Sequence, residues 1–418
     1  MRYAPAILVG RLTRFAARLR KPGGGSAVPG LVVNRIAPNY LKRTLSGFPQ
    51  GLVVVSGSSG KSTTTKMLVA ILRAHGVDVF TNPSTANISQ GLTSALLERA
   101  DWQGRVPGDV AVLEMDEGHG ALVMQGVDAR VVCLTNVMVD QIDRFHDSEM
   151  VAAMLGRIAA RAGESIVVNA DDAHLERLAA RVRAEVAVHR FGVTAEVLAA
   201  SPRGLGYTDT RAERLASGAG VLVEGVDGTA AVLDDAGAPV EIGLPARGVH
   251  YAVDAAAAYT TAKAVLGDRF SRSVAAEALS AIPAVFGRGE RTTVRGQPVE
   301  FVLVQNPASY QLNIDSIAPG TEQVLFAIGS DVRDPSYFWP ADASSLGRVS
   351  VVTGSKAAEA ALMLAYDGVE IDRVEPELAR ALDDFLAMPA PATGVKTIVF
   401  TADAMRRTRA HLGLAGAE

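Results

Sequence analysis

Residues 51–193 alternate between two patterns of apolar and polar positions. Short uninterrupted apolar runs rich in Val end at polar residues, and stretches with helical spacing of apolar positions separate them. Runs of this kind are typical of strands that are buried on both faces of a parallel sheet. The pattern therefore predicts an α/β fold with helices covering a parallel sheet, whose strands lie at 52–55, 110–114, 130–135, 165–169 and 187–191.

The pattern changes twice further along the chain. Residues 194–244 form short runs broken by Gly and Asp, which predict a small antiparallel, β-rich insertion. An Ala-rich stretch at 253–265 predicts a buried helix, and residues 286–292 are interpreted as a Gly-rich linker. Strand and helix patterns resume at 299–418. We expect a central domain over 46–292 and a smaller C-terminal α/β domain over 293–418.

Residues 1–45 form a separate lead-in. Apolar positions in 4–20 recur at helical spacing with arginines between them, which predicts a basic amphipathic helix. A Gly/Pro-rich connection follows at 22–30. Such a helix either packs on its own domain or lies on an anionic membrane surface, and packing is the expected arrangement.

The composition limits the classes of partner. The 418 residues suffice for two or three domains, and the net charge of −4 comes from interspersed charges, which argues against a nucleic-acid partner. The single cysteine, Cys133, lies in an apolar run and is expected to be a buried small side chain rather than a nucleophile. No apolar stretch reaches the ~20 residues that span a bilayer, and no signal peptide is recognisable. We expect a cytoplasmic protein, with the inner membrane surface as a second possible location.

The segment 51–65 combines a buried strand, a Gly/Ser turn and a helical pattern. This order is typical of a phosphate-binding loop, in which backbone N–H groups and the N-terminus of a helix face an anion. Lys61 would hold the β- and γ-phosphates and the Ser62 hydroxyl Mg²⁺. Because Val55 replaces the first glycine of the ordinary Walker motif, the shorter form favours ATP-dependent amide ligases over GTPases and motor ATPases. The predicted nucleotide-binding residues here are Gly57, Ser58, Ser59, Gly60, Lys61, Ser62 and Thr63.

Polar residues follow several other predicted strands. Glu114 ends the second long strand, and ligands gather at the carboxyl ends of parallel strands, so we expect it to bind Mg²⁺. Its neighbours Asp116 and Glu117 are either further ligands or solvated charges. The next strand leads to Asn136 and then to residues 140–146, in which His146 is either a substrate or metal contact or a surface histidine.

Three further segments contribute candidates. Residues 169–172, Asn-Ala-Asp-Asp, lie at a strand end and either face a nucleotide or cap a helix. His250 and Asp254 lie one turn apart at the start of a helix, where they are suited to contact an adenine or ribose. Arg288, between two glycines of the expected linker, is placed to reach a phosphate from the neighbouring domain.

Taken in order, these motifs resemble the Mur ligase superfamily, and within it the MurT-like ligase subunits of lipid II isoglutaminyl synthases. The resemblance implies a P-loop ATPase domain with a Rossmann-like C-terminal domain. It implies ATP and Mg²⁺ as cofactors, a GatD-like glutamine amidotransferase subunit as partner, and a lipid-linked muropeptide as substrate. The implied reaction activates the α-carboxylate of D-glutamate as an acyl phosphate for amidation. Lys61, Glu114 and the C-terminal carboxylate Asp334, which matches the family's catalytic aspartate, are the implied catalytic residues.

The chain also departs from the family pattern. Segment 194–244 lacks the cysteines of the zinc ribbon that MurT-like proteins commonly carry, so no zinc is expected. Leu155 or a neighbour stands where other Mur ligases have a carbamylated lysine, as in MurT-like sequences. Residues 305–311 and 334–342 differ from the corresponding family motifs. Two alternatives stay open: a ligase of Mur or folylpolyglutamate synthase type that joins an amino acid to a carboxylate, and a non-catalytic ATP-binding scaffold.

Overall fold

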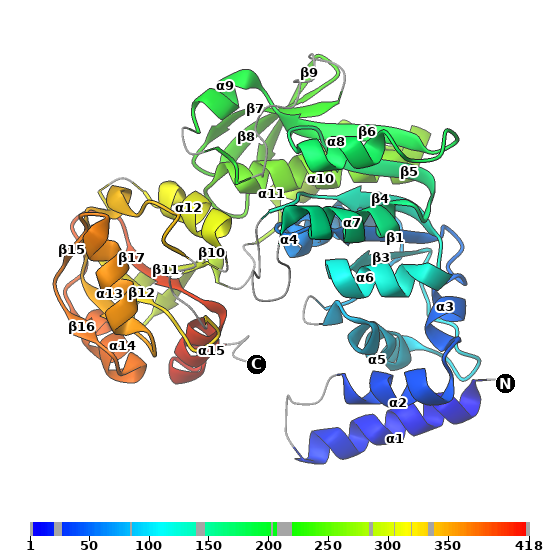
Figure 1. Cartoon of the computed structure of the whole chain (residues 1–418), viewed down its shortest axis with the longest axis horizontal. Helices are drawn as coiled ribbons and strands as arrows, with labels where there is room; N and C mark the ends of the chain where they lie inside the picture. Colours follow the sequence, from blue (N-terminus) through cyan, green and yellow to red (C-terminus); the bar gives the residue numbers. More distant parts are fainter. Residues whose placement is uncertain are drawn as a thin grey trace.

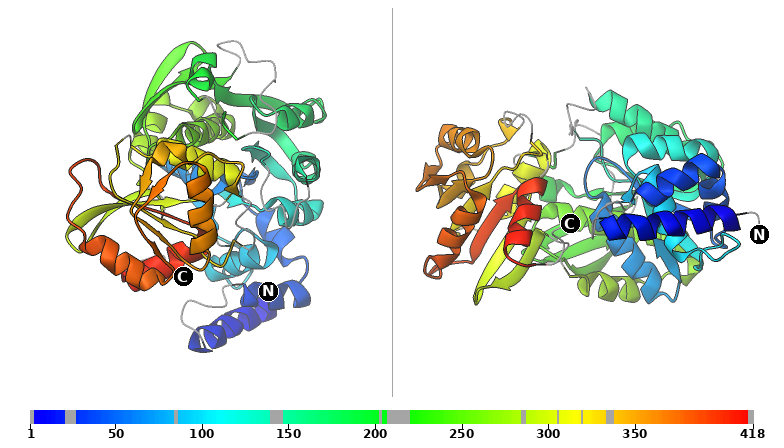
Figure 2. Two further views of the ribbon diagram at one scale, coloured as in Figure 1. Left: turned by 60° about the vertical axis from the view of Figure 1, so that its left-hand side comes forward. Right: turned by 90° about the horizontal axis from the view of Figure 1, so that it is seen from below.

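The protein consists of two α/β bodies that lie side by side, with two helices of the N-terminal segment at the outer end of the larger one (Figures 1 and 2). Each body is built on its own sheet. The computed structural model describes residues 3–20, 27–83, 86–138, 147–201, 204–206, 220–283, 287–304, 306–318, 320–332 and 338–414.

The larger body contains a mixed sheet with the strand order β2-β3-β1-β4-β5-β6-β7-β8-β9 over the described residues. The strands from β2 to β7 pair in parallel, and β7, β8 and β9 pair antiparallel. All five strands predicted from the apolar runs are present, which confirms the expected fold class. The bounds are β1 (Leu52–Ser56), β2 (Val79–Thr81), β3 (Val110–Glu114), β4 (Ala129–Leu134), β5 (Ala162–Asn169), β6 (Ala187–Val193), β7 (Val221–Asp227), β8 (Ala230–Asp235) and β9 (Ala238–Gly243).

Helices cover both faces of this sheet, because side chains of a strand alternate between the faces. In β1, Val53 and Val55 join one apolar core, and Leu52 and Val54 join the other. The first core is covered by α4 (Lys61–Ala74), α10 (Val249–Leu266) and α11 (Arg272–Ser280). The second is covered by α5 (Ser89–Arg99), α6 (Glu117–Val123), α7 (Ser148–Ala159) and α8 (Ala173–Ala179).

The antiparallel strands expected within 194–244 are present, and they extend the large sheet. After α9 (Ala195–Ala199), β7 pairs in parallel with β6, and β8 and β9 follow as a meander at the sheet edge. The predicted Ala-rich helix is α10, and the side chains of its middle turns are buried.

The smaller body has a second sheet with the order β10-β11-β17-β12-β14-β16. Among the strands that the structure describes in this sheet, only β10 is antiparallel to its neighbour. The bounds are β10 (Arg288–Val294), β11 (Gln297–Leu303), β12 (Val324–Ala327), β14 (Val351–Thr353), β16 (Val374–Glu375) and β17 (Lys396–Phe400), with β13 (Arg348–Val349) and β15 (Glu370–Ile371) as a separate pair. The helices are α12 (Pro307–Ser316), α13 (Ala357–Tyr366), α14 (Leu378–Ala387) and α15 (Ala402–His411).

The interpretation of residues 286–292 as a linker is wrong for 288–292. These residues form most of β10, which pairs with β11 through a register shift between Arg288 and Glu290. The glycines that suggested a linker, Gly287 and Gly289, have φ angles of 71° and 68° and shape this bulge instead.

The N-terminal segment forms α1 (Ala4–Arg20), α2 (Val28–Ile36) and α3 (Tyr40–Leu45). The predicted helix over 4–20 is confirmed, and it packs against α2 and α5. Ile7 and Val33 are fully buried between these helices. Among the described residues, no helix is both long and apolar enough to cross a membrane.

Candidate functional site

The turn between β1 and α4 has the backbone shape of a phosphate cradle. Gly57 and Gly60 have φ angles of 135° and 79°, in a region that residues with a Cβ rarely adopt. A Cβ at Gly57 would clash with the Thr135 hydroxyl, and a Cβ at Gly60 with the Asp254 carboxylate. Because both positions are closely surrounded, only glycines fit there, and the loop leads directly into the N-terminus of α4, the kind of helix end that binds anions in other proteins.

The end of β4 clamps this loop. The backbone N–H of Ser59 donates to the Asn136 side-chain oxygen at 2.8 Å, and the Asn136 amide nitrogen donates back to the Ser59 carbonyl at 3.2 Å. The Thr135 hydroxyl donates to the same carbonyl at 2.7 Å. The N–H of Ser58 donates to the Asn136 carbonyl at 3.0 Å. The loop is therefore held by a neighbouring strand rather than by its own residues alone.

Lys61 begins α4 and turns back over the loop. Its ammonium group donates to the carbonyls of Gly57 and Ser58, the latter at 3.1 Å, and lies 3.4 Å from a Glu117 carboxylate oxygen. Glu117 is buried, so of the two interpretations left open for it, a solvated surface charge is excluded. Two loop carbonyls and this carboxylate hold the lysine ammonium beside the cradle.

Glu114 ends β3 and is also buried. The Asn82 side chain fixes its backbone, since it accepts from the Glu114 N–H at 3.0 Å and donates to the Glu114 carbonyl at 3.1 Å. The Asn87 amide lies 3.4 Å from a Glu114 carboxylate oxygen. Sequence reasoning missed Asn82 and Asn87, although Asn82 follows a strand and the same rule would have found it.

A carboxylate and the hydroxyl of Ser62, in the first turn of α4, are the hard oxygen donors that Mg²⁺ prefers. Within the described ranges, no group of three or more His, Cys, Asp or Glu side chains is arranged to hold a metal ion.

Two other acidic residues cap helices. The Asp116 carboxylate accepts from the N–H groups of Gly118 and His119 at the start of α6, both at 3.1 Å. Asp172 caps α8 and also accepts from the N–H of Val137 at 2.6 Å, just beyond β4. Burial raises the pKa of Asp172. The helix-cap interpretation of residues 169–172 is thus confirmed for Asp172, which ties α8 to the strand end that clamps the loop.

The first two turns of α10 carry His250 and Asp254. Asp254 is buried against the loop at Gly60. His250 is half-buried, and its ring centre lies 4.2 Å from that of Tyr251. Cys133 is buried within β4, and burial raises the pKa of its thiol to about 12, which confirms that it is not an activated nucleophile.

Other sequence candidates are only partly located. The backbone of Arg288 begins β10, and its side chain lies outside the described residues. Asp334 and residues 140–146, which include His146, lie outside them as well.

Comparisons with known proteins agree with this arrangement. Residues 55–260 match the model of the Mur ligase middle domain. The MurT subunit of lipid II isoglutaminyl synthase (glutamine-hydrolyzing) from Staphylococcus aureus is 29% identical over 178 residues, 43% of this chain and 39% of that protein. UDP-N-acetylmuramate–L-alanine ligase from Bifidobacterium longum is 30% identical over 273 residues, 63% of this chain and 50% of that protein. The chain therefore spans half or less of these curated relatives.

A solved structure shows the same fold over a longer range. MurF from Acinetobacter baumannii superposes with a TM-score of 0.69 at 16% identity, and the match covers 92% of this chain and 80% of that one. The phosphate cradle, the strand-end residues that clamp it and the matched middle domain lie in the same part of the molecule. The chain contains a Mur ligase middle domain over residues 55–260 and is similar to MurT.

Proposed function

We propose that this protein is an ATP-dependent amide ligase that converts the D-glutamate of a lipid-linked muropeptide to D-isoglutamine in peptidoglycan synthesis. The observation that carries the proposal is the cradle between Gly57 and Lys61, clamped by Asn136 and flanked by the buried carboxylate of Glu114. The Mur ligase middle domain and the likeness to MurT support the same assignment.

The chemistry follows from the weak electrophilicity of a carboxylate. A carboxylate oxygen attacks the γ-phosphorus of ATP, ADP leaves, and an acyl phosphate forms. Ammonia then attacks the carbonyl carbon, the carbon–oxygen bond to phosphate breaks, and the amide and inorganic phosphate are released. Lys61 and the N–H groups of the loop would hold the transferring phosphate in line and stabilise the charge that develops on it.

Mg²⁺, when bound, supplies further positive charge at the phosphate oxygens. Ser62 and Glu114 would hold it, and Asn82 would position Glu114 through its backbone. His250 and Asp254 would lie on the nucleoside side of the site, and Arg288 would reach a phosphate from the smaller body. Because β10 (Arg288–Val294) pairs along its length with β11 in the sheet of the smaller body, the boundary expected between residues 292 and 293 would cut a strand, and we place the domain boundary before residue 288 instead. Asp334 would orient the step that receives ammonia.

The ammonia requires a second protein. Glutaminases use an exposed, activated cysteine, whereas Cys133 is buried with a pKa raised to about 12. We therefore assign the glutaminase step to a GatD-like subunit. Because the substrate is anchored to lipid, the two subunits would work in the cytoplasm at the inner membrane surface.

The test is amide formation from a lipid-linked muropeptide, ATP and glutamine with the candidate glutaminase subunit, followed by mass spectrometry. We expect the amidated product with both subunits, and with free ammonia in place of glutamine and partner. Lys61→Ala is expected to remove it in both cases. ATP turnover without any amide product would reject the assignment.

A second candidate is a ligase that joins an amino acid rather than ammonia. The alignment with UDP-N-acetylmuramate–L-alanine ligase covers more of this chain than the alignment with MurT. The same assay with L-alanine or L-glutamate instead of an ammonia source separates the two candidates. A product enlarged by an amino acid would favour the second.

A further inference from the structure

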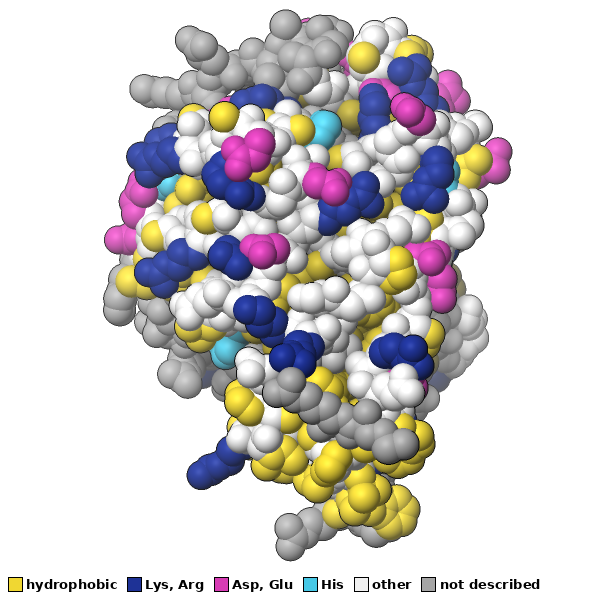
Figure 3. All heavy atoms as spheres, turned by 90° about the vertical axis from the view of Figure 1, so that its right-hand side faces the viewer, with side chains coloured by type: hydrophobic (Ala, Val, Ile, Leu, Met, Phe, Trp, Pro, Cys, Tyr) yellow, Lys and Arg dark blue, Asp and Glu magenta, His cyan; other side chains and the backbone are white. Residues whose placement is uncertain are grey.

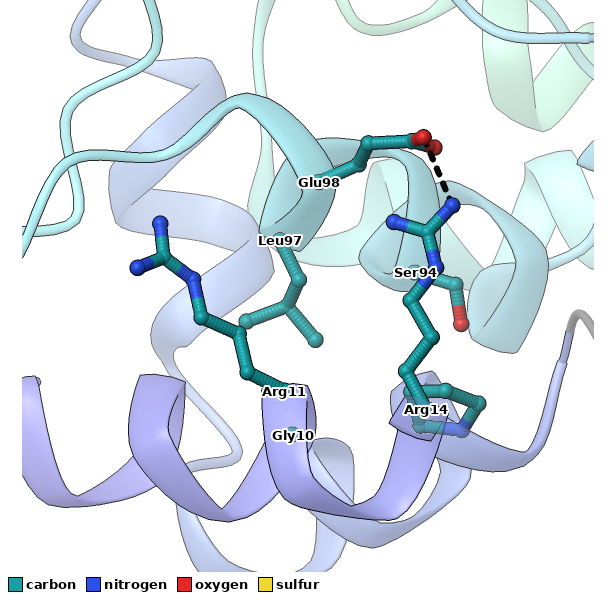
Figure 4. Close-up of a pocket in the computed structure, with 7 residues that line it drawn as sticks. Gly10, Arg11, Arg14, Ser94, Leu97 and Glu98 are labelled. Carbon is teal, nitrogen blue, oxygen red and sulfur yellow. Dashed lines mark ion pairs between the residues drawn. The ribbon is translucent and has the colours of Figure 1, made fainter. Parts of the chain in front are cut away.

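The solvent-facing stripe of α1 is apolar, which reverses the usual arrangement of a surface helix. Its exposed positions recur at helical spacing, and two of its arginines, Arg11 and Arg14, face the protein. Figure 4 shows Arg11 and Arg14 directed from α1 towards the side of α5 that carries Leu97 and Glu98. The exposed positions are Pro5, Leu8, Val9, Leu12, Phe15 and Ala16.

Helix α2 continues this surface. Val28, Leu31 and Ile36 are exposed large apolar side chains, and α2 packs along α1. Figure 3 shows hydrophobic side chains gathered at the lower end of the molecule, where α1 and α2 lie in Figure 1. We call these exposed side chains of the two helices the α1–α2 face. A contiguous apolar patch of this kind on a folded protein is typical of an interaction site.

Specific contacts fix α1 in this orientation. Arg11 donates to the Ala100 carbonyl at 2.7 Å and lies over the ring of Trp102, 4.6 Å from its centre. Arg14 pairs with Glu98 at 2.6 Å beside a pocket of about 160 Å³. At Gly10 a Cβ would press on Val33 and Leu97, so α1 approaches α2 and α5 closely. The apolar stripe therefore faces solvent, because the opposite side of α1 is held against α2 and α5 by these contacts.

The charge of the N-terminal segment indicates which kind of surface binds the α1–α2 face. Residues 1–50 contain nine Lys and Arg and no Asp or Glu, although the whole chain has a net charge of −4. Arg35, Lys42 and Arg43 are exposed on α2 and α3. Two copies of such a segment would repel each other, whereas an anionic surface would attract it.

We propose that the α1–α2 face docks on an anionic phospholipid bilayer, with α1 lying in the plane of the interface. An apolar stripe beside basic residues is the arrangement by which a helix rests on a membrane without spanning it. The face would hold the protein at the bilayer while the phosphate cradle stays in water.

The test is co-sedimentation of the full chain with vesicles of phosphatidylglycerol and phosphatidylcholine, and with vesicles of phosphatidylcholine alone. The variant is Leu12→Ser with Phe15→Ser, whose side chains are 57% and 65% exposed. The matched control is Leu362→Ser with Tyr366→Ser on α13, whose side chains are 53% and 73% exposed. Because all four side chains are exposed, both double variants are expected to fold, which circular dichroism and denaturant unfolding check. Vesicles without muropeptide lipid keep the measurement independent of the ligase assignment.

We expect the wild type and the α13 control to bind the anionic vesicles equally, more weakly at high salt and weakly to neutral vesicles. The α1 variant is expected to bind at least about tenfold more weakly. Absence of vesicle binding by the wild type, or equal binding by the α1 variant, would overturn the proposal. A wild-type dimer that the α1 substitutions convert to monomer would assign the face to a second copy. Loss of binding to a purified GatD-like subunit, with vesicle binding unchanged, would assign it to that protein.

Discussion

Replacing Asn136 by alanine tests whether the strand-end clamp orders the phosphate cradle. Asn136 is buried and makes two side-chain hydrogen bonds with the backbone of Ser59, at 2.8 and 3.2 Å. The bond from the Ser58 N–H to the Asn136 carbonyl uses the backbone and would persist. A hydrogen bond of this type contributes about 1 kcal/mol, so Asn136→Ala should lower the free energy of unfolding by about 2 kcal/mol.

The same loss should appear in nucleotide binding. If ATP binds only to the ordered loop, binding to the variant must order the loop without these two hydrogen bonds. The free energy of ATP binding then becomes less favourable by the same amount, and about 2 kcal/mol corresponds to a roughly 30-fold weaker affinity. Thr135→Val removes the hydroxyl that donates to the Ser59 carbonyl and keeps the side-chain shape. Its expected cost of about 1 kcal/mol corresponds to a roughly fivefold weaker affinity.

The assay combines isothermal titration with ATP and denaturant unfolding of each variant. Tyr259→Phe is the stability control. It removes one hydrogen bond, from the Tyr259 hydroxyl in α10 to the Asp235 carboxylate at the end of β8, and neither residue contributes to the clamp. We expect it to lower the free energy of unfolding by about 1 kcal/mol and to leave ATP affinity unchanged. An Asn136→Ala protein with the stability loss but an ATP affinity within about twofold of wild type would refute the clamp.

Three further substitutions probe separate parts of the molecule. Lys61→Ala should abolish ATP turnover, measured as ADP release, with the fold retained by circular dichroism; turnover within about tenfold of wild type would remove the lysine from the site. Asp334→Asn should leave ATP affinity unchanged while amidation with the partner subunit falls by orders of magnitude; near wild-type amidation would exclude this carboxylate. Burial would raise the pKa of Asp235, but hydrogen bonds and charge from Lys263 outweigh it and the pKa is lowered. Asp235→Asn should therefore destabilise the protein by about 2 kcal/mol at neutral pH. The difference should shrink as the pH falls below about 4, because the carboxylate of the unfolded chain is protonated there while that of the folded protein, with its lower pKa, still holds its charge. A difference that is constant with pH in denaturant unfolding would contradict this.

The local features of the fold were predictable from sequence. The runs at 52–55 and 110–114 are apolar throughout, because both faces of these strands are covered. The positions of Lys61 and Glu114 at the carboxyl edge of the parallel sheet were predictable, because a short motif and a strand end each mark such a position. Such signals are contained within a few consecutive residues.

The contacts between these features were not predictable in the same way. Lys61 and Glu117 form an ion pair although they are 56 positions apart in the sequence. Nothing in the local sequence around either residue indicates that the two side chains meet. The clamp joins Ser59 and Asn136, which follow two neighbouring strands, β1 and β4, but lie 77 positions apart in the chain. Glycines usually mark a break, so the sequence predicts a linker over residues 286–292, whereas residues 288–292 lie in a strand whose bulge is stabilised by tertiary pairing.

The fate of one substrate oxygen tests the central claim most directly. The D-glutamate α-carboxylate of the muropeptide is labelled with a heavy oxygen isotope, and the inorganic phosphate released with ATP and ammonia is examined by mass spectrometry. If the carboxylate is activated as an acyl phosphate, one labelled oxygen per amide formed must appear in the phosphate, since that carbon–oxygen bond breaks when ammonia attacks. Unlabelled phosphate accompanying ATP turnover would contradict the assignment of this protein as a carboxylate-activating ligase.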